Sequence, residues 1–240
     1  MLLTEHHSSW NEFLTAEILE LLNDIEKQIG EDYTPKKENV LRFMKQDLNS
    51  IKCVWLGQDP YFSMYGDNHF VANGKSFQPD DLEDWNQKFS QVSLKNIVRL
   101  VYKSENNITA YSDIKKFSDI KKEINNGTFK ILPPKEWFDS LEAQGVLFLN
   151  TSLTTKQGTA NAHKNIWAKF STKLLNYISE KNPNIHWFLW GNEACQKAQF
   201  IKNGILHQSN HPMMCNESKE NDFLKSDCFS ATKDIINWLG

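Results

Sequence analysis

The 240-residue chain lacks the features that mark several specialised classes of protein. No apolar run approaches the roughly 18 residues that a membrane-spanning helix needs. The four cysteines form no Cys-x-x-Cys pair, which disfavours a zinc or iron–sulfur centre and is typical of free thiols in a cytosolic protein. The first six residues offer neither a basic segment nor a long apolar one. We therefore expect no secretion signal and a cytoplasmic location.

Arginine is also scarce, because Arg42 and Arg99 are the only two. Arginine makes the commonest specific contact to guanine, so the chain has few side chains for direct recognition of base pairs. The net charge of −3 lacks the basic excess of a typical DNA-binding domain. However, residues 1–100 carry 10 basic and 16 acidic side chains, whereas residues 101–240 carry 17 and 14. The charge therefore does not exclude DNA, but it predicts few phosphate contacts and a shallow dependence of binding on salt.

The chain does contain enough apolar material for a sizeable core. Apolar residues make up 40% of it and aromatic residues 12%, with eight tryptophans. This composition argues against disorder, and the length fits one compact domain over residues 1–240. Residues 103–136 differ, because they are polar and contain a short tandem repeat, 112–117 followed by 118–123. We expect this segment to be an insertion, either a solvated helix or a mobile excursion.

Four short apolar runs predict strands. Residues 53–56, 146–149 and 187–190 are continuously apolar, which is typical of parallel strands covered on both faces. A fourth strand is predicted at 205–208. Helical periodicity lies between the runs, for example over 165–180. This alternation predicts an α/β fold, namely a three-layer α/β/α sandwich around a central, mainly parallel four-stranded sheet.

The N-terminal part predicts two helices. Ser9 and Glu12 form a potential capping box, apolar residues then recur at helical spacing, and Gly30 provides a stop signal. A second helical pattern covers about 36–48.

Polar residues follow each predicted strand. Asp59, Asn150, Asn192 and His211 all lie just beyond a strand end. Ligands of open α/β sheets bind outside the carboxyl ends of the strands, so we expect these four side chains to meet on one rim. Asp and Asn also favour turns for conformational reasons, and this alternative explains Asn192 well.

Seven segments in order then resemble the family-1 uracil-DNA glycosylases, over nearly the whole chain. They are Ser9-Trp10 with Phe13-Leu14, Leu56-Gly57-Gln58-Asp59-Pro60-Tyr61, Gly74-Lys75-Ser76-Phe77, Ser93-Leu94-Lys95-Asn96-Ile97, the stretch from Gly145 to Thr154, Phe188-Leu189-Trp190-Gly191, and His211-Pro212. The resemblance implies excision of uracil from DNA without a metal or a cofactor.

The resemblance also implies the roles of individual residues. Asp59 would orient the attacking water and face the sugar cation, and His211 would donate a hydrogen bond to the departing base. The base-binding residues would be Gln58, Tyr61, Phe77 and Asn150. Asn150 would read uracil, Phe77 would stack on it, and Tyr61 would exclude the methyl group of thymine. The DNA-binding residues would be Pro60, Ser93, Gly191, Asn192, Pro212, Met213, Met214 and Cys215.

The chain departs from the family pattern around these motifs. Phe62 stands where the family usually has a histidine, and the stretch from Tyr61 to Gly74, including Gly66, Asp67 and Asn68, is longer than usual. Met213 and Met214 replace the serine and proline that precede the family's wedge leucine, and either could be the wedge.

Three functions therefore stay open at this stage. The chain could excise uracil, it could excise a modified pyrimidine such as some phage DNAs carry, or it could be a catalytically weak DNA-binding module on the same fold. The retained Tyr61 and Asn150 favour the first, and the lengthened loop favours the second. We expect a monomer, and a DNA-mimicking protein inhibitor is a possible second partner beside DNA.

Overall fold

The computed structural model describes residues 2–65 and 69–240, so Gly66, Asp67 and Asn68 of the lengthened loop lie outside the described residues. The fold is built on a four-stranded sheet. Its strands are β1 (Cys53–Gly57), β4 (Val146–Asn150), β5 (His186–Trp190) and β6 (Ile205–Ser209), in the order β4-β1-β5-β6. All three strand pairs are parallel, which confirms the predicted sheet.

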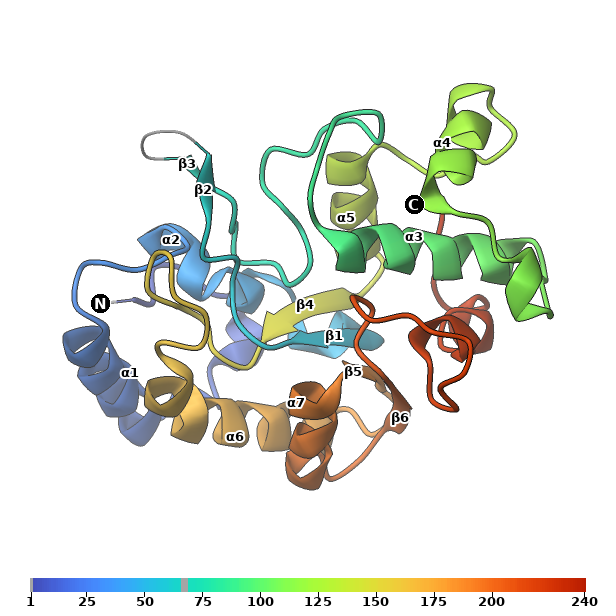
Figure 1. The fold of residues 1–240 in the computed structure, drawn as a ribbon. Helices are drawn as coiled ribbons and strands as arrows, with labels where there is room; N and C mark the ends of the chain where they lie inside the picture. Colours follow the sequence, from blue (N-terminus) through green and yellow to red (C-terminus); the bar gives the residue numbers. More distant parts are fainter. Residues whose placement is uncertain (1, 66–68) are drawn as a thin grey trace.

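Helices cover both faces of this sheet, as Figure 1 shows. On one face lie α1 (Ala16–Ile29), α6 (Lys164–Lys181) and the short α7 (Asn192–Cys195), and on the other lie α3 (Val92–Glu105) and α5 (Pro134–Ala143). Successive residues of a strand point to opposite faces of the sheet. Val54 and Leu56 therefore pack in the core between the sheet and the helices α1 and α6, while Cys53 and Trp55 pack in the core on the side of α3 and α5. The predicted three-layer sandwich is thus confirmed.

The N-terminal segment differs from its prediction. The long helix begins at Ala16, capped by the Thr15 hydroxyl, and not at Ser9. Ser9 instead lies in a single 3-10 turn, η1 (Ser8–Trp10), and its hydroxyl accepts a hydrogen bond from the Leu48 backbone N–H at 2.9 Å. The cap signal was wrong because a distant backbone group uses the same hydroxyl.

The predicted helix at 36–48 is also broken into shorter pieces. They are α2 (Lys37–Val40), η2 (Arg42–Lys45) and η3 (Leu48–Ser50). Leu41 leaves the helical region between the first two, and the Asp47 carboxylate caps the third by accepting from the Asn49 N–H at 3.0 Å. The buried side chains of this segment still face the core, so the apolar pattern was correct although the helix was not continuous.

Residues 103–136 pack against the body of the protein. They include the end of α3, η4 (Tyr111–Asp113), α4 (Phe117–Asn125) and the start of α5. Ile114 and Ile120 occupy equivalent positions in the two repeats, and both are buried. Of the two forms expected, the structure shows helices, and one apolar face of the segment packs against the core. Its origin as an insertion stays a prediction.

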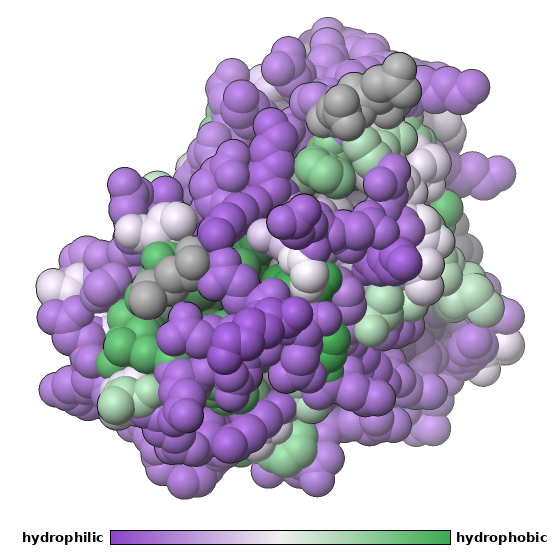
Figure 2. Space-filling view, turned by 90° about the vertical axis from the view of Figure 1, so that its left-hand side faces the viewer, coloured by the Kyte–Doolittle hydropathy of each residue, from purple (hydrophilic) through white to green (hydrophobic). Residues whose placement is uncertain are grey.

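Smaller elements complete the molecule. A two-stranded antiparallel pair, β2 (Met64–Tyr65) and β3 (His69–Phe70), extends from the loop after β1, and 3-10 turns η5 (Gln196–Phe200), η6 (Phe223–Lys225) and η7 (Ser230–Thr232) lie near the C-terminus. Figure 2 views the side of the molecule that carries β2 and β3, where hydrophobic residues reach the surface in patches among hydrophilic ones. None of the helices in the described ranges has the length and apolar character needed to cross a membrane.

Candidate active site

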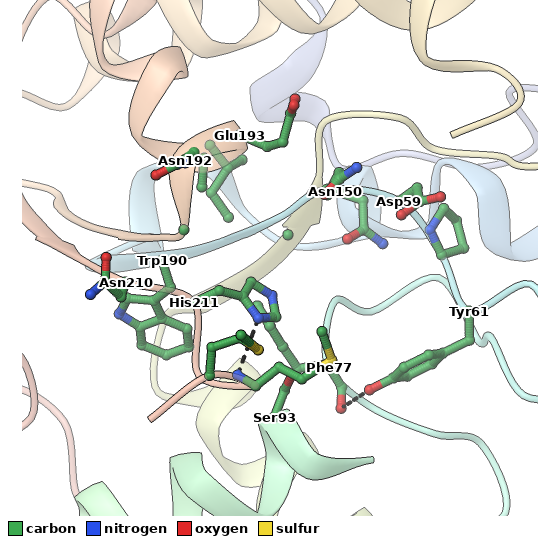
Figure 3. Close-up of a pocket in the computed structure, with 18 of the residues that line it drawn as sticks. Asp59, Tyr61, Phe77, Ser93, Asn150, Trp190, Asn192, Glu193, Asn210 and His211 are labelled. Atoms are coloured by element: carbon green, nitrogen blue, oxygen red, sulfur yellow. Dashed lines mark hydrogen bonds between the residues drawn. The ribbon is translucent and has the colours of Figure 1, made fainter. Parts of the chain in front are cut away.

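A cavity of about 540 Å³ opens at the carboxyl ends of the strands (Figure 3). Its wall combines the loops that follow β1, β5 and β6 with Asn150 at the end of β4, the segment of Lys75 and Phe77, and the start of α3. Twelve of the fourteen residues predicted for the site line it: Gln58, Asp59, Pro60, Tyr61, Phe77, Ser93, Asn150, Gly191, Asn192, His211, Met213 and Met214. The predicted meeting of Asp59, Asn150, Asn192 and His211 on one rim agrees with this geometry.

Asp59 lies in the loop after β1. Its Oδ2 accepts a hydrogen bond from the Asn161 backbone N–H at 2.7 Å. Burial raises the pKa of the Asp59 carboxyl above its usual range, and the Asn161 N–H opposes that rise. The Gln58 carbonyl beside it accepts from the Ser152 N–H and the Thr151 hydroxyl, both at 2.9 Å. These bonds tie the loop after β1 to the loop after β4.

Asn150 is the last residue of β4 and lies directly beside Gly57. The residue is 6% exposed, and its side-chain amide forms no hydrogen bond with any residue in the described ranges. A Cβ atom at position 57 would lie 2.2 Å from the Asn150 Oδ1, so glycine there provides the space for this amide. The site therefore contains a positioned donor and acceptor that no described residue of the protein engages.

His211 follows β6 and faces the cavity (Figure 3). Its Nδ1 accepts a hydrogen bond from the Met213 N–H at 3.2 Å, which assigns the proton of the neutral ring to Nε2. Burial lowers the pKa of His211 below its usual range, and this favours the neutral form. The ring is therefore a neutral donor at Nε2.

Phe77 and Tyr61 form the apolar part of the wall. Phe77 has a φ of +65°, which is uncommon outside glycine, and its ring centre lies 5.4 Å from that of Trp190 and 6.5 Å from that of His211. The Tyr61 hydroxyl donates to the Phe77 carbonyl at 3.1 Å. The backbone of Phe77 is therefore held directly by the neighbouring wall residue.

Lys75 anchors the same segment from behind. Its ammonium group is almost fully buried and contacts Asp139 at 2.7 Å and Glu142 at 2.9 Å. A buried charge of this kind is tolerated only when it is paired. The two carboxylates therefore fix the backbone that presents Phe77 to the cavity.

The outer rim is apolar and exposed. Met213 is 56% exposed, Met214 is 59% exposed and Phe62 is 40% exposed. Pro212 and Cys215 do not line the cavity. Pro212 is buried, and its carbonyl accepts from the Asn96 amide at 2.6 Å and from the Cys215 thiol at 3.4 Å. Both residues support the loop that carries Met213 and Met214. Their contact with DNA stays a prediction.

Three residues near the site were not predicted from the sequence. Asn161 contacts Asp59 from a position 102 residues away, and Gly57 and Lys75 had no assigned role although they lie in quoted motifs. The polar turn that contains Asn161, between a strand and a helix, was the available signal. No three His, Cys, Asp or Glu side chains within the described ranges gather as metal ligands would.

Comparisons with known proteins agree with this geometry. No family model matches the chain. A uracil-DNA glycosylase of Pseudoalteromonas translucida is 30% identical over 97% of this chain and 96% of its own length. The UNG crystal structure from Nitratifractor salsuginis superposes with a TM-score of 0.69, at 18% identity over 96% of this chain and 91% of that one. A variant of mimivirus UNG, solved in complex with UGI, gives a TM-score of 0.66, at 21% identity over 88% of this chain and 71% of that one.

The fold and the rim define an α/β enzyme class with its site at the carboxyl ends of a parallel sheet. The chain belongs to the uracil-DNA glycosylase family.

Proposed function

We propose that the protein is a monofunctional DNA glycosylase that flips uracil out of DNA and hydrolyses its N-glycosidic bond, which leaves an abasic site for base excision repair. The observation that carries this proposal is the meeting of Asp59, Asn150 and His211 in one cavity, in a chain of this family. A base inside a duplex cannot be reached, so the nucleotide must leave the stack and enter a pocket.

Asn150 and Phe77 form the binding site for the flipped base. The Asn150 amide offers a donor and an acceptor, and the orientation that matches the edge of uracil mismatches that of cytosine. Cytosine would leave buried polar groups unpaired, and such groups discriminate strongly. The Phe77 ring, held against Trp190, provides a flat apolar surface for stacking.

Asp59 acts on the sugar side of the bond. Cleavage develops positive charge on the sugar, as in other glycoside hydrolyses, and a nearby carboxylate stabilises that charge. We assign Asp59 to this task and to the orientation of the water that adds to the sugar carbon. The electron pair of the broken bond passes to the base.

His211 acts on the base side. Negative charge builds on the departing uracil, and a donor fixed in advance toward that charge contributes about 3–4 kcal/mol. The Nε2–H of the neutral ring is such a donor, because Nδ1 is engaged by Met213. A charged imidazole would instead attract Asp59, so the lowered pKa of His211 supports this role.

The rim suits a DNA partner. Met213 or Met214 would enter the space that the flipped base leaves, since exposed apolar side chains serve as wedges between bases. We also propose that a protein imitating DNA can occupy this rim, which the mimivirus UNG structure in complex with UGI supports. We expect a monomer, and the four free thiols support a cytoplasmic location.

Release of free uracil from a uracil-containing single-stranded oligonucleotide tests the proposal. The wild-type protein should release uracil, and Asp59→Asn should lower the rate by roughly 10²–10⁴-fold. The variant retains the shape of the side chain and an acceptor for the Asn161 N–H, and it removes a buried charge. Its Tm should therefore not fall, which separates lost catalysis from lost folding.

The same assay decides between the three functions. Release of a 5-modified pyrimidine without release of uracil would contradict the proposal and support a shifted pocket. Binding to duplex DNA without release of a base from any substrate would leave only a binding module.

A further inference from the structure

The loop of residues 155–163, which leads from the strand β4 region to α6, contacts the catalytic loop of residues 58–62 at several points. The Gly158 N–H donates to the Phe62 carbonyl at 3.0 Å. The Asn161 N–H donates to the Asp59 Oδ2 at 2.7 Å, and the Gln58 amide donates to the Asn161 Oδ1. The catalytic loop is therefore held by a segment that the proposed mechanism does not use.

The backbone of Asn161 has an unusual conformation. Its φ is +61°, in the left-handed region that few residues other than glycine and asparagine adopt readily. This conformation presents the N–H to the Asp59 carboxylate. A backbone in a sparsely populated conformation at a functional site is kept there by the surrounding structure.

The surrounding loop is fixed from within. The Thr155 hydroxyl donates to the Thr159 carbonyl at 2.7 Å and accepts from the Ala162 N–H at 3.3 Å. Thr154 Oγ1 accepts from the buried Trp167 indole at 2.7 Å and also forms a hydrogen bond with the His163 Nδ1 at 2.9 Å. The loop is thus anchored to α6 before it reaches Asp59.

We infer that Asn161 is a positioning residue, whose backbone N–H fixes the Asp59 carboxylate in the orientation that water activation requires. This inference rests on the proposed function. The hydrogen bond also opposes the rise in the pKa of Asp59 that burial causes. Loss of the bond should therefore both misorient the carboxylate and raise its pKa further. The other titratable groups that line the cavity are Tyr61, Lys75, Glu193, His211 and Lys219.

Substitution of Asn161 separates the backbone from the side chain. Asn161→Val disfavours the left-handed conformation, whereas Asn161→Gly retains it and the N–H but removes the contact with Gln58. We expect Asn161→Val to lower kcat by about 10–100-fold on a uracil-containing single strand and to shift the acid limb of the pH profile to higher pH. Asn161→Gly should keep the position of that limb.

Asn107 provides a matched control. It is a second exposed asparagine with a positive φ, of +51°, and it does not line the cavity. Asn107→Val should introduce similar backbone strain but leave kcat and the acid limb unchanged. If Asn161→Val does not fold, as judged by its Tm, Asn161→Ala replaces it in the same comparison.

An NMR titration of the Asp59 carboxyl carbon reads the hydrogen bond without turnover. The pKa of Asp59 should rise in Asn161→Val and stay constant in Asn161→Gly and Asn107→Val. Equal pKa values in all four proteins would overturn the inference, as would a wild-type pH profile for Asn161→Val. A wild-type protein that releases no uracil would instead contradict the proposed function, and the titration would still decide the positioning role.

Discussion

Single residues determine which groups in the cavity are free to act. The Asn150 side-chain amide lies in the wall of the cavity and is unpaired with the described residues. A donor and an acceptor that are already in position lose little conformational freedom when a complementary base binds. Asn150 and Asp59 could be predicted because each follows an apolar strand. Asn161 could not, because its role depends on a positive φ and a contact across 102 positions.

Tyr61 should determine whether thymine is rejected. Its ring lines the cavity, and its hydroxyl is bonded to the Phe77 carbonyl. Tyr61→Ala should permit excision of thymine at a detectable rate, because space opens for the 5-methyl group. Tyr61→Phe retains the ring and should keep the discrimination. Measurement of uracil and thymine release by both variants checks this, and an unchanged ratio in Tyr61→Ala would mean that another residue forms the wall.

Elements position these residues, and they were predictable to different degrees. The strand predicted at residues 53–56 differs from β1 only by the added Gly57. The prediction succeeded because a short, continuously apolar segment is typical of a strand that is buried on both faces. Ser9 was predicted as a helix cap, yet its hydroxyl accepts from Leu48. Local signals fail where a polar side chain can serve a distant partner, and no pattern near Ser9 reveals that partner.

Gly191, between β5 and α7, should be required for the position of His211. Its φ is +91°, and a Cβ there would lie 2.9 Å from the Cβ of His211. Gly191→Ala should destabilise the fold by about 1–3 kcal/mol and lower uracil release at least tenfold. Gly127→Ala is the control, because Gly127 has a φ of +76° but open space around it. Similar activity loss in both variants would exclude a specific effect on His211.

The loop after β6 should act as the wedge. Met213→Ala and Met214→Ala should slow excision from duplex DNA by roughly tenfold, since loss of an apolar contact of about 1.4 kcal/mol changes a rate by that factor. Excision from single strands should change less, because no base pair has to be opened there. Rate measurements on matched single- and double-stranded oligonucleotides check this. Equal losses on both would contradict the wedge.

At the scale of the whole molecule, ion pairs engage part of the positive charge of the later half of the chain. Lys173 contacts Glu17 at 3.0 Å, and Lys181 pairs with Glu12, so lysines of α6 meet acids of the N-terminal segment. Exposed pairs of this kind contribute little stability. They do reduce the positive charge that the later half of the chain could offer to phosphates. A shallow dependence of DNA binding on salt, expected from the composition, stays a prediction. The pairing of these lysines with glutamates gives a physical reason for it.

Buried and half-buried histidines should make the protein less stable in mild acid. Burial lowers the pKa of His163, His186, His207 and His211, so the unfolded chain binds more protons than the folded one. Stability should be greatest above about pH 6.5 and fall as the pH decreases below it. Asp59 has a raised pKa and contributes in the opposite direction, at lower pH.

Thermal unfolding at pH 7.5 and pH 5.5 measures this effect. The Tm should be lower at pH 5.5. His207→Gln should reduce the difference, whereas substitution of the exposed His6 by Gln should leave it unchanged. A Tm that is constant between the two pH values would show that these rings do not control stability.

All eight tryptophans are buried, but Trp190 alone among them lines the cavity. Its ring also packs against Phe77, the proposed stacking partner of the base. A base that enters the cavity therefore arrives beside the Trp190 indole, and Trp55 lies behind it, with ring centres 5.2 Å apart. A change of intrinsic fluorescence should therefore accompany entry of a base in real time, and Trp190→Phe should weaken that change.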